Sequence, residues 1–261
     1  MQADIAPRPY GPFGLLVSLV AVAAAAAACF AVLGALLFLA AALAGGQQEA
    51  SALAERLGRL DARALAQALP ASQRAFFGVG CMLYLAGLGG LLAVARWRGG
   101  RAFGRLLAWD PAPIWPGARV AGLFLAACLA YHLVAGLTMR LLFPEFAAWL
   151  FVPRDPLAAA LSFLMVVVLA PLVEELFFRG WIFTSLRARF AGRVAIAVST
   201  VAFAFAHWDA TGLYPVAVLL PGWTLGTIRE RLGSSRPAFA AHALYNGVGW
   251  IVLFIAGLIL R

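Results

Sequence analysis

The chain has 261 residues, of which 64% are hydrophobic and only 12% charged, and its formal net charge is +9. Soluble domains are typically about half apolar and a quarter charged, so the composition argues against a soluble protein and predicts an all-α polytopic membrane helix bundle. All 20 residues counted as Lys or Arg are arginines, which we interpret as the composition of a bacterial protein from a GC-rich genome. We attribute the positive charge to loops at the lipid bilayer surface and expect no nucleic-acid partner.

Seven apolar stretches have the length and composition expected of membrane helices. They run over residues 13–43, 75–95, 120–138, 157–186, 194–207, 213–228 and 237–260. The first is too long for a signal peptide and lacks an A-x-A cleavage pattern, so we predict a tilted first helix. Cys29, Cys81 and Cys128 lie in three separate stretches without ligand or disulfide spacing, and we interpret them as small packing residues.

The arginines are unequally distributed between the two sides of this predicted bundle. With seven spans, the side that holds the N-terminus carries 12 arginines and the opposite side carries seven. The positive-inside rule therefore predicts a multi-pass protein of the bacterial inner (plasma) membrane with a cytoplasmic N-terminus.

A helix of a different kind is predicted on the outer side, between the first two spans. Within residues 49–69, Leu53, Leu57, Leu60 and Leu65 follow helical spacing, and charged residues occupy the opposite face. This pattern predicts an amphipathic helix at the membrane interface. Two roles remain open for it: a linker helix packed on its neighbours, or a lid that guides substrate.

Few ionisable groups lie at membrane depth, where an unpaired charge costs about 3 kcal/mol or more, so each is a candidate functional group. They are His132, Glu174, Glu175, Arg179, His207 and His242, with Asn246 as a nearby amide.

The two adjacent glutamates are separated by helical geometry. Glu175 and Arg179 are four residues apart, so they share a face and can pair. Glu174 is rotated from Glu175 by about 100° and is less neutralised. A buried structural pair would account for Glu175 and Arg179, but it leaves Glu174 without a local partner. Glu174 is therefore the candidate general base.

The two histidines that follow have both structural and catalytic interpretations. His207 ends the sequence FAFAH, one turn after Phe203, whose ring can pack against it. A single histidine at a helix end is more often structural than catalytic. His242 and Asn246 are again four apart, so together they can either clamp neighbouring helices or direct donors at a developing oxyanion.

Three motifs on successive membrane helices, in this order, resemble the CPBP (Abi) family, which includes the CAAX prenyl endopeptidases and bacteriocin-processing or self-immunity proteins. They are EE-x-x-x-R (Glu174, Glu175, Arg179), F-x-x-x-H (Phe203, His207) and H-x-x-x-N (His242, Asn246). The resemblance extends over about 157–260, so we expect a catalytic core in 151–261 and additional membrane helices in 1–150. The CAAX endopeptidases have eight membrane helices, so an eighth membrane helix remains possible here in addition to the seven predicted.

The resemblance implies an intramembrane glutamic endopeptidase that acts on a membrane-associated peptide or protein and uses no cofactor or metal. Glu174 would activate a water that His207 helps to hold. His242 and Asn246 would stabilise the oxyanion, and the adjacent glutamate–arginine pair would brace the first motif. The resemblance gives no indication of the oligomeric state.

Two rival hypotheses use the same polar residues. A zinc site is one, since one glutamate and two histidines are a common ligand set; the lack of an H-E-x-x-H motif and the nearby arginine argue against it. The other is a non-enzymatic membrane scaffold or bacteriocin self-immunity protein, in which these groups only hold helices or a partner. A scaffold would tolerate Glu174→Gln, whereas a protease would not.

Overall fold

The computed structural model describes part of the chain, namely Gly14 and residues 70–112, 119, 122–124, 126–131, 153, 155–208 and 214–259. Every regular element in these residues is a helix, in agreement with the predicted all-α membrane bundle. The predicted first span (apart from Gly14), the amphipathic helix near 49–69 and His132 lie outside the described residues, as does most of the span at 120–138.

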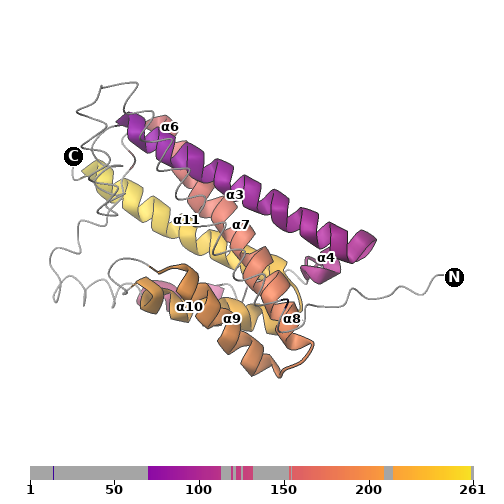
Figure 1. Ribbon diagram of the computed structural model, residues 1–261. Coiled ribbons are helices and arrows are strands. Elements are labelled where there is room, and N and C mark those ends of the chain that lie inside the picture. The colour runs from indigo at the N-terminus through magenta and orange to yellow at the C-terminus, as the bar shows by residue number, and fades with distance from the viewer. Residues whose placement is uncertain are drawn as a thin grey trace.

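Three long helical rods form the main body of the protein (Figure 1). They are α3 (Pro70–Gly99), a continuous rod that runs over Pro156–Arg187, and α11 (Ser235–Ile259). Each contains a segment that is long and apolar enough to cross a membrane: Phe76–Trp97, Pro156–Arg187 and Ser235–Ile255, with mean hydropathies of 1.9, 2.4 and 1.6. These segments confirm three of the predicted spans, and the protein is a multi-pass membrane protein.

The middle rod is not a uniform α-helix. Its segments are α6 (Pro156–Phe163), η3 (Leu164–Leu169), α7 (Ala170–Glu174), η4 (Glu175–Ile182) and α8 (Phe183–Arg187), of which η3 and η4 are π-helices. A π-helix pairs each N–H with the carbonyl five residues earlier, so its wider turns leave some carbonyls without the usual partner. Ordinary α-helical geometry, which we assumed from the sequence, is therefore wrong for these two segments.

The middle rod begins at a well-formed N-cap. The Asp155 carboxylate accepts hydrogen bonds from the Leu157 and Ala158 N–H groups, both at 3.0 Å, and Pro156 occupies the first turn. The same carboxylate accepts a hydrogen bond of 3.0 Å from Arg74 Nε at the start of α3. One side chain thus stabilises the helix start and links two rods.

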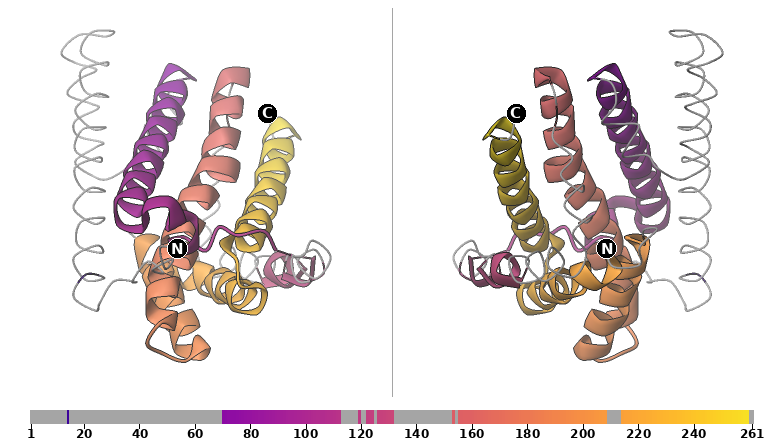
Figure 2. Two further views of the ribbon diagram at one scale, coloured as in Figure 1. Left: turned by 90° about the vertical axis from the view of Figure 1, so that its right-hand side faces the viewer. Right: turned by 90° about the vertical axis from the view of Figure 1, so that its left-hand side faces the viewer.

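Two shorter helices, α9 (Gly192–Ala206) and α10 (Tyr214–Leu232), pack against each other at one end of the three rods (Figure 2). With 15 residues, α9 is about 22 Å long, less than the roughly 30 Å of a bilayer core. α10 contains Pro221 and ends in two arginines. Both predicted spans are helical as expected, but neither is among the helices long and apolar enough to cross a membrane.

The middle rod and the two short helices meet in an apolar cluster that spans η4, α8, α9 and α10. Its buried members are Phe178, Ile182, Phe183, Leu186, Ala195, Ile196, Phe203, Ala204 and Val218. Because lipid is as apolar as these side chains, close packing and buried hydrogen bonds hold such helices together. This cluster fixes α9 and α10 against the part of the rod that carries the two glutamates.

The start of α11 is attached to the segment that follows η1 (Gly100–Ala102) and α4 (Phe103–Leu106). The Ser235 hydroxyl donates to the Leu107 carbonyl at 2.7 Å, and the Ser235 N–H donates to Ala108 O at 2.8 Å. Gly180 of η4 lies against the same place, since a Cβ on it would be 2.6 Å from Leu107 O. Only glycine fits there without a backbone shift.

Candidate active site

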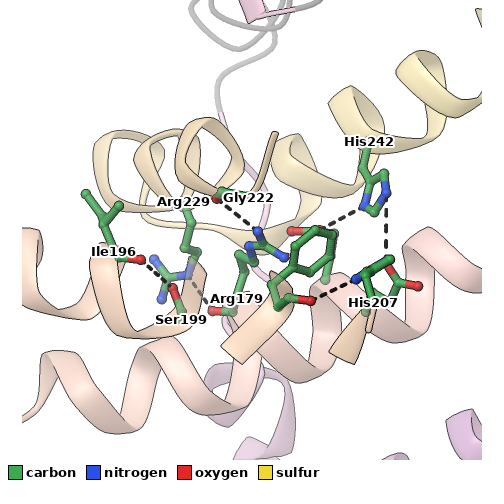
Figure 3. Close-up of polar contacts among 10 residues, drawn as sticks. Arg179, Ile196, Ser199, His207, Gly222, Arg229 and His242 are labelled. Carbon is green, nitrogen blue, oxygen red and sulfur yellow. Dashed lines mark hydrogen bonds and ion pairs between the residues drawn. The ribbon is translucent and has the colours of Figure 1, made fainter. Parts of the chain in front are cut away.

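Three side chains from three different helices come together, and Figure 3 shows two of them, His207 and His242. Glu174 ends α7, His207 is the C-cap of α9, and His242 lies on α11. Glu174 Oε2 lies 3.8 Å from His207 Nε2 and 3.9 Å from His242 Nε2. The exposed fractions of the three side chains are 15%, 19% and 8%, so the group is largely enclosed but open to small molecules.

Glu175, the next residue, points into the protein instead. Its Oε1 accepts a hydrogen bond of 3.1 Å from Arg179 NH1, and both side chains are fully buried. The pair predicted from the four-residue spacing therefore forms, although η4 is a π-helix. Arg179 NH2 also donates to the Gly222 carbonyl of α10 at 3.0 Å, and its guanidinium lies 4.3 Å from the Phe203 ring centroid.

Glu175 has a second partner that the sequence analysis did not predict. His242 Nδ1 lies 3.0 Å from Glu175 Oε1, the same oxygen that receives Arg179. Glu175 therefore links a buried guanidinium on its own rod to an imidazole on α11. It belongs to the buried pair with Arg179 and also contacts one of the two histidines that face Glu174.

Hydrogen bonding at Nδ1 fixes the protonation pattern of both imidazoles. His207 Nδ1 lies 2.8 Å from the Phe203 carbonyl oxygen, which can only accept, so Nδ1 carries the proton. His242 Nδ1 likewise donates to the carboxylate of Glu175. In its neutral form each ring thus presents the Nε2 lone pair toward Glu174. Such a partner on the far nitrogen is the usual way in which a protein orients a functional histidine.

Asn246 occupies a position created by the first π-helix. Its Nδ2 donates to the Val166 carbonyl at 2.9 Å. The Ala170 N–H, which would bind Val166 in an α-helix, donates to Met165 O instead. Pro171, five residues after Val166, has no N–H to offer. Asn246 therefore uses one of its two amide hydrogens to satisfy a carbonyl that the backbone leaves free, and its role as an oxyanion donor stays a prediction.

A second side chain donates to a backbone carbonyl of η4. Arg229 Nε of α10 donates to the Arg179 carbonyl at 3.1 Å. The Phe183 N–H points to the carbonyls of Phe178 and Gly180 rather than to that of Arg179. Both π-helices therefore receive a hydrogen bond from a neighbouring helix, which ties the shape of the middle rod to α10 and α11.

Phe203 forms the apolar centre of the site. Its ring centroid lies 4.4 Å from that of His207 and 5.8 Å from that of His242, and Arg179 lies over its face. The contact with His207 is the packing predicted from FAFAH. One aromatic ring therefore adjoins both imidazoles and the buried guanidinium.

Two tyrosines that the sequence analysis did not identify also belong to this region. Tyr84 of α3 is an electrostatic neighbour of both Glu174 and Tyr214 of α10. The Tyr214 ring centroid lies 5.6 Å from that of His207. One signal in the sequence could have indicated Tyr84: a phenol inside an apolar span requires a hydrogen-bond partner.

The described residues contain no group of three or more His, Cys, Asp and Glu side chains arranged to hold a metal ion. That the site uses no metal or other cofactor stays a prediction, which metal analysis of the purified protein can test.

Comparison with known families agrees with the motifs. Residues 155–248 match the family model described as Type II CAAX prenyl endopeptidase Rce1-like. This segment is similar to the CAAX protease-like family. It begins at Asp155, the N-cap of α6, and ends two residues after Asn246, so it contains all three motifs. Comparisons with curated proteins and with solved structures give no match.

Proposed function

We propose that the protein is an intramembrane endopeptidase in which Glu174 activates a water to hydrolyse a peptide bond. The observation that supports this most strongly is the placement of Glu174 Oε2 at 3.8 and 3.9 Å from two Nε2 atoms. Polar atoms separated by this distance are readily bridged by one water. A general base must lie within hydrogen-bonding reach of the proton that it removes.

The proposed reaction has two steps. Water gives a proton to the Glu174 carboxylate while its oxygen bonds to the substrate carbonyl carbon, and the C=O π electrons move to the carbonyl oxygen. His207 Nε2 accepts a hydrogen bond from the second O–H of the water and so orients the water. The tetrahedral intermediate then collapses, the C–N bond breaks, and Glu174 passes its proton to the leaving nitrogen. The products are a carboxylic acid and an amine, which exchange a proton to become a carboxylate and an ammonium group, and Glu174 is regenerated as a carboxylate.

His242 is proposed to stabilise the oxyanion as an imidazolium. Its Nδ1–H already donates to Glu175, so Nε2 becomes a donor only when the ring carries a second proton. The Glu175 carboxylate stabilises that cation. With Glu174 and Glu175 negative, and Arg179 and His242 positive, the enclosed cluster has no net charge, which limits the cost of its burial.

Glu175 and Arg179 are positioning residues in this proposal. Arg179 is anchored to Gly222 O at 3.0 Å and to the Phe203 ring, and it holds the Glu175 carboxylate. Glu175 in turn holds His242 at 3.0 Å. The second amide hydrogen of Asn246 is the proposed additional donor to the oxyanion.

The substrate class proposed is a membrane-associated peptide or protein. The description of the matching family names CAAX prenyl endopeptidases, whereas a bacterial source favours peptide leaders or apolar C-terminal tails. Beside His207, Phe205 and Trp208 are 70% and 64% exposed, so an apolar surface adjoins the site. Such a surface suits a substrate that arrives from the lipid phase.

The test uses purified protein in detergent and two quenched-fluorescent probe peptides. Both have an apolar C-terminal tail, and one also carries a farnesylated cysteine. Cleavage in H₂¹⁸O should place one ¹⁸O atom in the new carboxylate, as measured by mass spectrometry. Glu174→Gln should lower the rate by a factor of about 10² to 10⁴. If neither probe is cleaved, or if Glu174→Gln cleaves as the wild type does, the proposal is wrong and the scaffold hypothesis is favoured.

A further inference from the structure

Arg229 of α10 is a buried arginine to which the proposed reaction assigns no role. The residue is 9% exposed and lies in the last turn of its helix. Burial of a guanidinium is costly unless hydrogen bonds replace those it made to water. The carboxylate that follows it in the chain, Glu230, is bonded to Arg187 at 2.8 Å. The groups that Arg229 itself binds therefore indicate why an arginine is placed there.

The Arg229 guanidinium binds two groups of the middle rod. Its Nε donates to the Arg179 carbonyl of η4 at 3.1 Å (Figure 3), and its NH2 donates to Thr184 Oγ1 of α8 at 3.2 Å. The guanidinium also lies 5.2 Å from the Phe183 ring centroid. Hydrogen bonds from a charged donor are about twice as strong as those between neutral groups. Arg229 thus fastens the end of α10 to the turn of the rod that begins at Arg179.

One face of α10 holds both the backbone and the side chain of Arg179. Arg179 NH2 donates to the Gly222 carbonyl at 3.0 Å, while Arg229 binds the Arg179 carbonyl. Gly222, Gly226 and Arg229 follow helical spacing, so they share this face. A Cβ on Gly222 would lie 3.2 Å from the Phe203 ring and 3.6 Å from Arg179 NH2. The face therefore approaches the rod and α9 closely.

Arg179 connects this face of α10 to the candidate active site. Its NH1 donates to Glu175 Oε1 at 3.1 Å, and the same oxygen lies 3.0 Å from His242 Nδ1. Glu175 and Arg179 both belong to η4, a π-helix, which is a rare form of backbone. If the turn at Arg179 relaxed to α-helical geometry, the rotation between the two residues would change and the Glu175 carboxylate would move relative to His242. Three direct contacts thus lead from Arg229 to that imidazole.

We propose that Arg229 is a positioning residue of the active site. By holding the Arg179 carbonyl, it keeps Glu175, and through it the His242 imidazole, in place for the oxyanion. This inference rests on the proposed function. Arg229 does not touch the reacting atoms, and no bond forms or breaks at it. A misplacement of about 1 Å, caused by a change far from the chemistry, can lower a rate about 10²-fold.

The first measurement compares Arg229→Met with Arg231→Met, using the probe peptide that the wild type cleaves. Both changes remove one arginine from the last turn of α10, but Arg231 is exposed. We expect Arg229→Met to lower kcat about 10- to 10²-fold. KM should stay within about threefold of the wild-type value, because the reacting groups rather than the substrate contacts are displaced. Arg231→Met should keep the wild-type kcat. All rates are measured well below the melting temperature of each variant, so that they refer to folded protein.

The second measurement observes His242 directly and does not depend on cleavage. The chain has three histidines, so in protein labelled with ¹⁵N-histidine the Nδ1–H signal of His242 is identified by its loss in His242→Gln. A proton that is donated to a carboxylate gives a signal at low field. In Arg229→Met this signal should move to higher field or exchange with water faster, whereas Arg231→Met should leave it unchanged. A merely structural role would lower the melting temperature without changing the signal.

A third variant, Arg229→Lys, keeps the charge but replaces the planar fork by one ammonium nitrogen. Its kcat and its His242 signal should lie between those of the wild type and Arg229→Met. If Arg229→Met does not fold, Arg229→Lys carries the test, and wild-type values in it would overturn the inference.

The outcomes separate this inference from the proposed function. A wild-type kcat or an unchanged His242 signal in Arg229→Met, with Glu174→Gln inactive, would overturn the role of Arg229 and leave the glutamate mechanism intact. An equal loss of kcat in Arg231→Met would also overturn it, since the effect would then be one of charge alone. Cleavage by Glu174→Gln at the wild-type rate, or no cleavage of either probe by the wild type, would overturn the proposed function and this inference together.

Discussion

Glu174 and Glu175 are adjacent in the chain, but their surroundings give them different chemistry. Glu175 is fully buried and bonded to Arg179 and His242, so its charge is held by two partners. Glu174 is partly open and faces two ring nitrogens at 3.8 and 3.9 Å. A base needs access to a water, whereas a positioning carboxylate needs fixed donors. The proposed division of roles follows from this difference.

The atoms that face Glu174 also give a direct test of the zinc hypothesis. Two imidazoles and a carboxylate are residue types that zinc accepts, but among the described residues no three such side chains are arranged to hold a metal ion. Our account predicts less than about 0.1 zinc per chain in purified protein, and cleavage of the probe that is unchanged by a chelator. Metal analysis and the cleavage assay check this. One zinc per chain, lost together with activity and restored with it, would replace the glutamate-activated water by a metal-bound one.

At the scale of the elements, the two π-helices determine how the site is held. η3 leaves the Val166 carbonyl to Asn246, and the Arg179 carbonyl of η4 accepts a hydrogen bond from Arg229. Each of these hydrogen bonds comes from another helix. The bundle therefore fixes the local shape of the middle rod, and this shape in turn fixes Glu174 and Glu175.

Asn246→Leu should consequently destabilise the protein as well as reduce cleavage. The change keeps the side-chain size but removes the donor to Val166 O, and an unsatisfied buried carbonyl costs roughly 1–3 kcal/mol. Thr224→Val is the matched control, because Thr224 Oγ1 donates to a carbonyl of its own regular helix at 2.9 Å. The melting temperature in detergent should fall for Asn246→Leu and stay near the wild-type value for Thr224→Val. Equal values for both would show that the π-helix does not depend on Asn246.

Contacts within one helix could be predicted from the sequence, while contacts between helices could not. The spacing of four residues indicated the pairing of Glu175 with Arg179 and the packing of Phe203 on His207, and both are present. The hydrogen bond from His242 to Glu175 joins residues 67 positions apart, and no local pattern indicates it. The π-helices were missed for the same reason, since the side chains that satisfy their carbonyls come from α10 and α11.

At the scale of the whole molecule, the three side chains that converge at the site lie within the segment that matches the family. Glu174, His207 and His242 all belong to residues 155–248. The sequence predicted the three long spans and the all-α class because both follow from apolar length. The sequence analysis wrongly treated α9 and α10 as equivalent to the long spans. Both are helical, but they are too short or too charged to be counted as membrane spans. The division at residue 150, the outer helix near 49–69 and the cytoplasmic N-terminus stay predictions.

The attachment of α3 to the middle rod should depend on pH through Asp155. Hydrogen bonds from Ala158 and, to a lesser extent, from Arg74 and Leu157 hold the pKa of this carboxyl below its ordinary value of 3.8. A carboxyl whose pKa is lowered by folding stabilises the folded state above that ordinary value and loses this effect as the pH falls through the folded pKa. Asp155→Asn should therefore melt below the wild type at pH 7, with a difference that shrinks as the pH falls to about 3. Melting curves in detergent at pH 7, 5 and 3 check this, and a difference that is constant over the range would contradict it.

The most direct test of the central claim compares Glu174→Gln with Glu175→Gln by melting temperature and probe cleavage. Glu174→Gln should fold with the wild-type melting temperature and lose cleavage by a factor of about 10² to 10⁴, because only basicity is removed. Glu175→Gln leaves Arg179 buried and unpaired, a change that costs roughly 3–5 kcal/mol, so it should lose stability as well as activity. Adding Arg179→Met to Glu175→Gln should recover part of the stability but not the full activity. If Glu174→Gln proves unstable while Glu175→Gln is stable and inactive, the two roles are reversed and the account is contradicted.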